Sequence, residues 1–93
     1  MKAIWKDTII AESNETVVIE HNHYFPPESL KQKHFKPSDH TTSCSWKGIA
    51  SYYHIEVNGE TNINAAWCYA TPKNIVKEIR GRIAFWEGVE VIE

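Results

Sequence analysis

Short runs of β-branched and aromatic residues, separated by turn-forming residues, recur from the start of the chain. Residues 3–5 and 8–11 are expected to pair as a hairpin around a Lys6-Asp7 turn. Residues 16–20 are rich in β-branched side chains and should form a third strand. Residues 21–27 end in two prolines, which cannot donate hydrogen bonds to a ladder, so the strand pattern is expected to break there.

The most regular strand pattern covers Gly48–Val57. It is followed by Asn58-Gly59, a dipeptide typical of two-residue hairpin turns because both residues tolerate positive φ. Residues 61–63 are expected to form the return strand, and residues 65–69 a separate strand after it. The middle of the chain therefore predicts a central antiparallel sheet.

Proline positions predict two short helical segments. Pro27 is expected to open one helical turn within residues 28–33. Thr71 as N-cap and Pro72 as the first helical residue predict a second helix. The residues of its buried face and the glycine that ends it would be Ile75, Val76, Ile79 and Gly81.

The chain ends in a further strand pair. Residues 82–86 and 89–92 are expected to form a closing hairpin around Glu87-Gly88, and Phe35 with Lys36 a short edge strand earlier in the chain. The pattern as a whole predicts a mainly β protein in which residues 1–93 form a single small domain with one or two short helices.

Composition narrows the classes of function. The 93 residues are enough for one core, and four Trp, four Tyr and three Phe supply much of it. A formal net charge of −2 argues against a nucleic-acid partner bound through phosphate neutralisation. No apolar run approaches a membrane span and no signal peptide precedes the first strand, so we expect no membrane partner and a cytoplasmic protein with reduced thiols.

Strand alternation assigns two faces to Gly48–Val57. The more apolar set is expected to face the core and consists of Ile49, Ser51, Tyr53, Ile55 and Val57. The other set would carry Tyr52 and His54 to positions that solvent or a ligand reaches, together with Ala50 and Glu56.

Residues 44–48 precede this strand and carry the candidate chemistry. A reactive cysteine must be partly thiolate, and a neighbouring cation lowers its pKa, as Lys47 would do for Cys44. Gly48 would let the backbone approach a ligand closely, and a histidine from elsewhere would act as general base. In the alternative interpretation, Cys44 is a small buried hydrophobe and the Lys47 stem lies over aromatic side chains.

Two further segments raise binding hypotheses. Tyr24 and Phe25 form either a wall of a ligand pocket or a plug that folds into the core. His21 and His23 would share one face of a strand, but the chain has no Cys-x-x-Cys pair and no histidine pair at the helical spacing of zinc enzymes. Surface histidines in a loop are the simpler interpretation, so no metal site and no cofactor are expected.

Several motifs form a combination that covers nearly the whole chain: Glu20-x-Asn22-x-Tyr24-Phe25-Pro26-Pro27, Thr41/Thr42-x-Cys44-x-Trp46-Lys47-Gly48-x-Ala50-x-Tyr52-Tyr53, Ala65-Ala66-Trp67-x-Tyr69 before Pro72, and Ile79-x-Gly81-x-Ile83-Ala84-Phe85-Trp86. This combination resembles the domain-of-unknown-function family 427. The resemblance implies a β-tent-like fold, in which curved antiparallel sheets meet at an angle, and no established activity. Ser45 stands where the family commonly has proline, which would stiffen the loop that presents Cys44.

These observations lead to three hypotheses about function. The first is a small domain that binds a small polar or anionic ligand in a pocket near residues 44–48. Its expected lining residues are Asn22, Tyr24, Phe25, Trp46, Lys47, Gly48, Tyr52 and His54. The second is a thiol-dependent enzyme with Cys44 as nucleophile and Lys47 as its activating cation. The third is a protein-interaction module without catalysis, which would use an exposed aromatic patch or a sheet edge.

Overall fold

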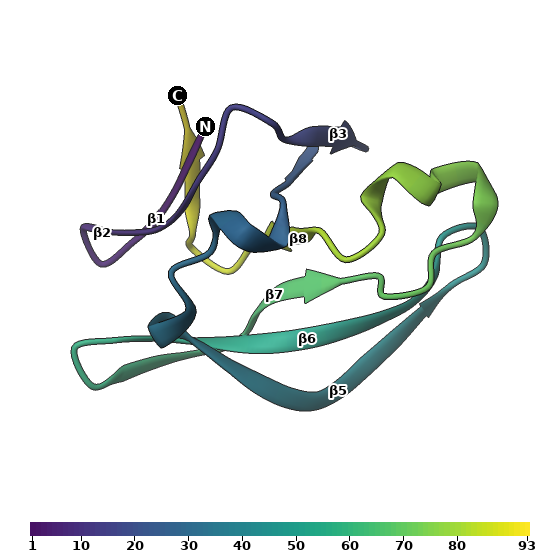
Figure 1. The fold of residues 1–93 in the computed structure, drawn as a ribbon. Helices are drawn as coiled ribbons and strands as arrows, with labels where there is room; N and C mark the ends of the chain where they lie inside the picture. The colour runs from purple at the N-terminus through teal and green to yellow at the C-terminus, as the bar shows by residue number, and fades with distance from the viewer.

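Nine strands in three antiparallel sheets form the computed structural model, which describes residues 1–93 (Figure 1). The sheets have the orders β2-β1-β9, β3-β4 and β5-β6-β7-β8. The strands are β1 (Lys2–Trp5), β2 (Thr8–Glu12), β3 (Val17–Ile19), β4 (Asn22–Tyr24), β5 (Phe35–Cys44), β6 (Gly48–Val57), β7 (Glu60–Cys68), β8 (Ile83–Phe85) and β9 (Glu90–Ile92). The predicted mainly β, antiparallel class is confirmed.

Two-residue turns with positive φ at both positions close the predicted hairpins. Lys6-Asp7 joins β1 to β2 with φ of 51° and 58°, and Asn58-Gly59 joins β6 to β7 with φ of 51° and 80°. Positive φ at both central residues is the feature of type I′ turns, whose twist matches that of the flanking strands. Both predicted turns are therefore confirmed.

The sequence prediction misses a third turn of this kind, at Glu20-His21. Its φ angles are 52° and 68°, and it returns the chain from β3 into β4, where the strand pattern is expected to break. Neither glutamate nor histidine is among the Asn, Asp and Gly residues that mark such turns, so the composition gives no signal. The two prolines follow only after β4 has ended.

The extents of two strands and the pairing of two others also differ from the prediction. β5 is a ten-residue edge strand rather than a two-residue one, because a shift of register between Pro37 and Thr41 accommodates the proline. β7 is one strand rather than two, because Asn64, with φ of 53°, absorbs an irregularity within it. The Glu87-Gly88 turn closes no hairpin: β8 pairs with β7, and β9 pairs with β1.

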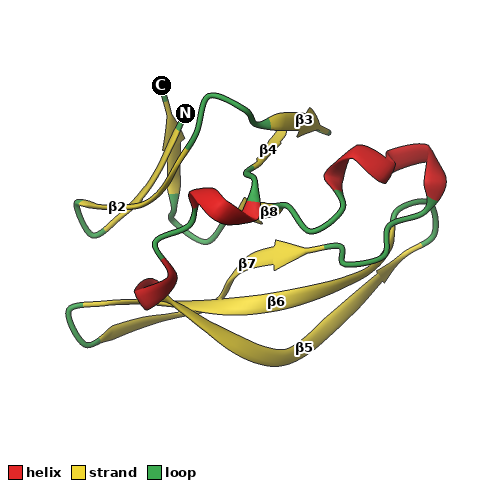
Figure 2. Cartoon of the chain, viewed as in Figure 1, coloured by secondary structure: helices red, strands yellow, loops and turns green.

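The helical segments are all 3₁₀ turns and consist of Pro27–Ser29, Gln32–His34 and Asn74–Ile79 (Figure 2). The last one begins after Lys73 rather than at Thr71, has no side-chain cap and is interrupted at Val76. Because its residues do not follow the α-helical period, Ile75 is 73% exposed while Val76 and Ile79 are buried. None of these segments has the length and apolar character needed to cross a membrane.

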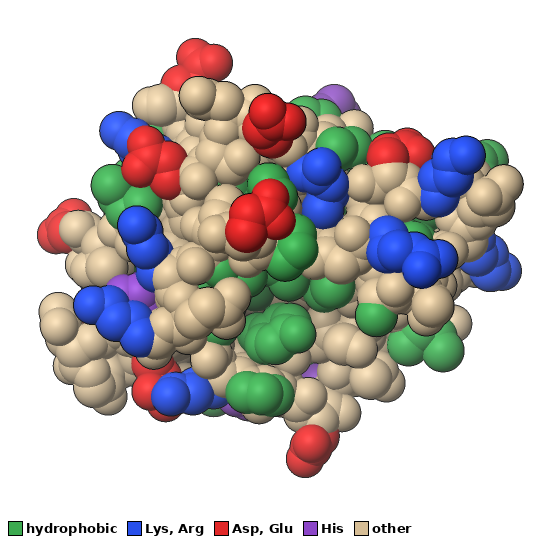
Figure 3. Space-filling view, viewed as in Figure 1, with side chains coloured by type: hydrophobic (Ala, Val, Ile, Leu, Met, Phe, Trp, Pro, Cys, Tyr) green, Lys and Arg blue, Asp and Glu red, His purple; other side chains and the backbone are tan.

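The four-stranded sheet packs a different core against each face. Cross-strand neighbours on one face are Tyr53, Ala66 and Phe85, and those on the other are Tyr52, Trp67 and Ala84. The first core joins the first face to Ala3 and Ile10 of the β2-β1-β9 sheet. The second core joins the second face to Tyr24 of β4 and Ile79 of the last 3₁₀ segment. Figure 3 shows hydrophobic side chains at the centre of one side of the molecule, with most charged side chains around them.

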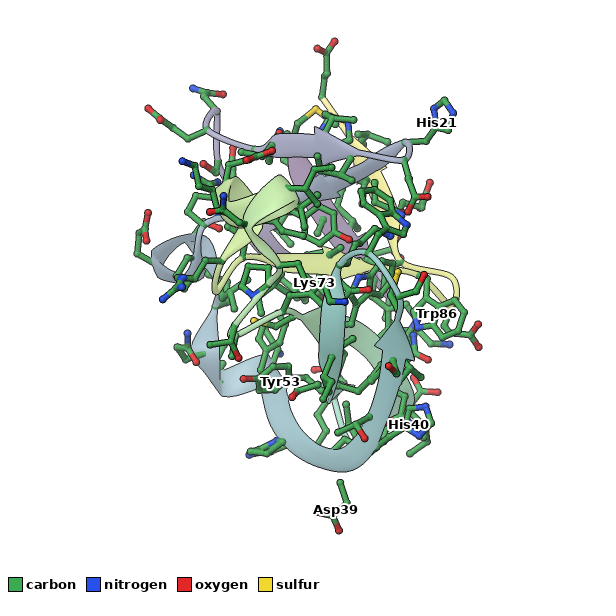
Figure 4. The ribbon with its side chains drawn as sticks, turned by 90° about the vertical axis from the view of Figure 1, so that its right-hand side faces the viewer. His21, Asp39, His40, Tyr53, Lys73 and Trp86 are labelled. Atoms are coloured by element: carbon green, nitrogen blue, oxygen red, sulfur yellow. The ribbon has the colours of Figure 1, made fainter.

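This division corrects the predicted faces of β6. The residues on the first core are Tyr53, Ile55 and Val57, as predicted. Ile49 is 63% exposed and Ser51 is exposed as well, whereas Ala50 is buried in the second core. The reason is that each core covers only half of this long strand. Figure 4 shows Tyr53 pointing to the opposite side of the molecule from His40 and Trp86.

Backbone hydrogen bonds join the β3-β4 hairpin to the four-stranded sheet. The Phe25 N–H donates to the Ile83 oxygen at 2.7 Å, and the Ile83 N–H donates to the Phe25 oxygen at 2.9 Å. Successive residues of an extended segment point to opposite faces, so Tyr24 enters the second core and Phe25 the first. The hairpin is thereby anchored in both cores.

Ile79→Ala should lower the free energy of unfolding by about 2–5 kcal/mol, because it empties space around a fully buried side chain. The matched change Ile75→Ala, in the same 3₁₀ segment, should alter it by less than about 0.5 kcal/mol. Urea unfolding followed by circular dichroism measures both values. Equal losses in the two variants would contradict the placement of Ile75 outside the core.

Candidate functional site

A cavity of about 200 Å³ opens beside the second core. Its wall combines segments far apart in the sequence: Lys47 from the β5-β6 turn, Tyr52 from β6, Trp67 from β7, Tyr69 after β7 and Trp86 after β8. Tyr52 and Trp67 are direct partners across β6 and β7, which sets their side chains side by side. Four aromatic rings and one lysine therefore share one small space.

Hydrogen bonds hold the two indole rings of the cavity in place. Trp67 Nε1 donates to the Tyr24 hydroxyl at 3.2 Å, and the two rings meet edge to face with centroids 6.3 Å apart. Trp86 Nε1 donates to the Asn64 carbonyl oxygen at 2.6 Å, and its ring meets Trp67 edge to face at 5.9 Å. Edge-to-face contact is a favoured geometry for aromatic pairs. The aromatic wall is therefore oriented without help from a ligand.

Tyr52 is held by side chains of the neighbouring edge strand. Its hydroxyl shares a 3.0 Å hydrogen bond with Thr42 Oγ1. The His40 ring lies against the Tyr52 ring with centroids 4.7 Å apart. Tyr52, which strand alternation assigned to the accessible face, thus lines the cavity from a fixed position.

Lys47 brings a nearly buried ammonium to the cavity. Its side chain is 10% exposed, and Nζ forms an ion pair with Glu20 of the β3-β4 turn. Nζ also lies 4.8 Å from the Trp46 ring centroid and 6.0 Å from that of Tyr69. Burial lowers the pKa of the ammonium, but the Glu20 hydrogen bond and the neighbouring Tyr24 and Tyr69 outweigh it and hold the pKa above its usual value. Lys47 therefore stays protonated at neutral pH.

Cys44 lies next to the cavity without lining it. Its thiol is free, and the side chain packs, half-buried, against the second core. The backbone N–H groups of Trp46 and Lys47 hydrogen-bond the sulfur and lower the pKa of the thiol below its usual value, with a smaller contribution from the Lys47 ammonium. Sequence reasoning assigned this effect to the lysine charge, whereas the turn backbone contributes most of it.

Cys68 has the opposite environment. It is buried in the first core, and this burial raises the pKa of its thiol. Cys44 packs against the second core, so the two thiols lie toward opposite faces of the four-stranded sheet.

Four of the other predicted lining residues are not part of the cavity wall. Tyr24 is fully buried and reaches the cavity only through its hydrogen bond to Trp67. Trp46 is 39% exposed, and Asn22 is half-buried in β4. Phe25 is fully buried in the first core, on the other face of the sheet.

Gly48 and His54 have structural partners of their own. Gly48 has φ of 116°, and a Cβ at this position would lie 3.4 Å from the Thr71 carbonyl oxygen. Glycine therefore lets the β5-β6 turn approach the segment after β7. His54 Nδ1 accepts a hydrogen bond from the Asn64 N–H at 3.0 Å, at the irregularity in β7. Neither residue lines the cavity.

Sequence reasoning missed three lining residues: Trp67, Tyr69 and Trp86. Trp67 and Tyr69 are two residues apart, which is the spacing of one strand face. The missing information is the register that sets Trp67 beside Tyr52. Trp86 reaches the cavity because it follows β8, where the chain leaves the four-stranded sheet to pair as β9 with β1. The local residue pattern does not reveal this change of sheet.

The histidines of the β3-β4 hairpin have local roles. His21 occupies the turn, and His23 Nδ1 shares a 3.0 Å hydrogen bond with Thr16 Oγ1. No three His, Cys, Asp or Glu side chains gather closely enough to hold a metal ion.

Comparison with known protein families identifies the family of this chain. The family described as a domain of unknown function (DUF427) matches residues 1–93, so the protein belongs to this family. No curated protein matches the chain. The family description states no activity.

Iodoacetamide should alkylate Cys44 and leave Cys68 largely unmodified in the folded protein, because only Cys44 is accessible. The pH midpoint of Cys44 alkylation should lie below the value of about 8.5 for a free cysteine, since a lowered pKa keeps the thiolate at lower pH. Peptide mass spectrometry after timed exposure across pH measures both.

Lys47→Met provides the control for this experiment. It removes the charge but keeps the backbone N–H groups of the turn, so the midpoint for Cys44 should keep most of its displacement. A wild-type midpoint equal to that of N-acetylcysteine would contradict the assigned environment of Cys44.

Proposed function

We propose that this protein binds a small planar ligand, a single ring with one polar or anionic substituent, in the cavity formed by the four aromatic rings and Lys47. The observation that carries the proposal is the composition of this wall, which places one protonated amine among aromatic side chains. Ligand pockets typically combine an apolar, often aromatic, lining with a few polar groups that fix orientation.

The volume of the cavity suits a ligand of roughly one ring. A dry apolar cavity of about 150 Å³ is large enough to hold benzene. The cavity of about 200 Å³ therefore leaves room for a ring and one substituent. Ligands of drug size occupy pockets of about 300–1,000 Å³. A ring suits this wall better than an aliphatic chain, because its face and edge both find complementary aromatic surfaces.

Lys47 is the group that would recognise the polar substituent. Its ammonium has more N–H donors than its single hydrogen-bond partner, Glu20, uses. Because Lys47 is nearly buried, a hydrogen bond from this ammonium competes less with water than one at the surface. Trp67 and Trp86 are already fixed by their own hydrogen bonds, which reduces the ordering cost of binding.

A thiol-dependent reaction is the second candidate, favoured by the lowered pKa of Cys44 beside the cavity. A thiolate there would be near a ligand held by Lys47. No histidine lines the cavity, so the thiolate formed by the turn backbone would act without a histidine base from the wall. A cytoplasmic location, which we propose with this function, would keep Cys44 and Cys68 reduced.

Titration with benzamide and with benzoate tests the pocket. The protein has four Trp, whose indole N–H signals report separately in ¹H–¹⁵N NMR spectra. Both probes should shift the signals of Trp67 and Trp86, which line the cavity. The signal of Trp5, which packs against the first core, should stay in place.

Trp86→Ala should weaken the binding of both probes by about tenfold, because stacking on one aromatic side chain contributes about 1–3 kcal/mol. Trp5→Ala is the matched control. It removes an indole that packs against the first core, outside the cavity wall, and should change affinity by less than about twofold. If the two variants bind the probes equally well, or if Trp5 shifts as much as Trp86, the proposed pocket is wrong.

A further inference from the structure

Glu20 neutralises the one charged residue of the cavity wall. Its carboxylate pairs with the Lys47 ammonium, although the two residues come from different hairpins. The Glu20 side chain is 52% exposed, whereas that of Lys47 is 10% exposed. The lysine charge thus faces the cavity with a carboxylate already beside it, and an anionic group of a ligand would have to share or take that place.

The β3-β4 turn fixes the backbone of Glu20 in a conformation that Lys6 and Glu87 also adopt, with φ of 51° and 56°. Glu20 has φ of 52°, in the left-handed region that is unfavourable for residues other than glycine, asparagine and aspartate. Asparagine or glycine would form the same turn more readily. The contact that the Glu20 side chain makes here is the one with Lys47.

Another cation near the β5-β6 turn does not offset Glu20. Lys73 donates a hydrogen bond to the Ser45 carbonyl oxygen at 2.7 Å, but it is exposed and does not line the cavity. The charge of Lys47 in the wall is therefore balanced by Glu20 beside it.

We infer that Glu20 is the specificity-determining residue of this site, and that it selects a neutral ring bearing a carbonyl or similar hydrogen-bond acceptor over an anionic ring of the same shape. This inference rests on the proposed function of the cavity. A neutral acceptor binds a remaining N–H of Lys47 and leaves the ion pair intact. An anion either adds a second negative charge beside Glu20 or displaces Glu20 from its partner, and both cost affinity.

Benzamide and benzoate form a suitable pair of probes because they share ring and shape and differ in charge. Wild-type protein should bind benzamide more tightly than benzoate. Glu20→Gln keeps the length of the side chain and an acceptor for Lys47 but removes the negative charge. It should shift the affinity ratio toward benzoate by about tenfold. Dissociation constants come from the Trp67 and Trp86 indole signals.

A matched control removes a carboxylate from another lysine pair. Glu60 lies 3.7 Å from Lys6 in an exposed pair outside the cavity wall. Glu60→Gln changes the net charge by the same amount as Glu20→Gln, and it should leave the ratio of the two affinities unchanged. This comparison separates a local effect from the general effect of net charge on anion binding.

A second pair of variants covers the case in which Glu20→Gln does not fold. Glu20→Asp and Glu20→Asn have the same shape, and both residues tolerate positive φ well. The aspartate variant should retain more of the preference for benzamide than the asparagine variant does.

The outcomes separate this inference from the pocket proposal. If both probes bind at the cavity but the ratio is the same in wild type and Glu20→Gln, or if wild type prefers benzoate, the role of Glu20 is overturned and the pocket stands. If neither probe shifts Trp67 or Trp86 in any variant at its solubility limit, the pocket itself is wrong and the role of Glu20 falls with it.

Discussion

The pair of backbone hydrogen bonds between Phe25 and Ile83 is the junction on which the arrangement of the sheets depends. It places the end of the β3-β4 hairpin against β8, and the alternation of side chains then sends Tyr24 and Phe25 into different cores. Two consecutive residues, Tyr24 and Phe25, therefore contribute one large aromatic side chain to each core. A small domain has little apolar surface to spare, so this shared contribution links the stability of the two cores.

The candidate site depends on the same junction. The hairpin that carries Tyr24 into the second core also carries Glu20 to the Lys47 ammonium. Tyr24 in turn orients Trp67 through its hydroxyl. The cavity therefore forms where the second core ends and its aromatic side chains become accessible. The polar group of the cavity is the Lys47 ammonium. Its position depends on the contact between the β5-β6 turn and the β3-β4 turn, which are distant in the sequence.

Local patterns were sufficient for much of the fold and for part of the site. Alternation and the Asn58-Gly59 dipeptide defined β6 and its hairpin, because both signals arise from adjacent residues. The partner of β9 and the placement of Trp86 depend on long-range pairing, which leaves no mark on neighbouring residues. The Glu20-His21 turn could not be predicted for a different reason. Two-residue turns with positive φ are common in hairpins, but glutamate and histidine are unusual residues for them. Lys47 was identified from its neighbours, whereas its partner Glu20 required the structure.

The placement of the two cysteines on opposite faces of one sheet determines how the protein responds to oxidants. A disulfide needs sulfur atoms that approach each other directly, and here the sheet separates Cys44 from Cys68. Cys68 is enclosed in the first core, so Cys44 is the thiol that meets peroxide or a foreign disulfide. Oxidation of the folded protein should therefore begin at Cys44, beside the cavity, without forming a disulfide to Cys68 of the same chain.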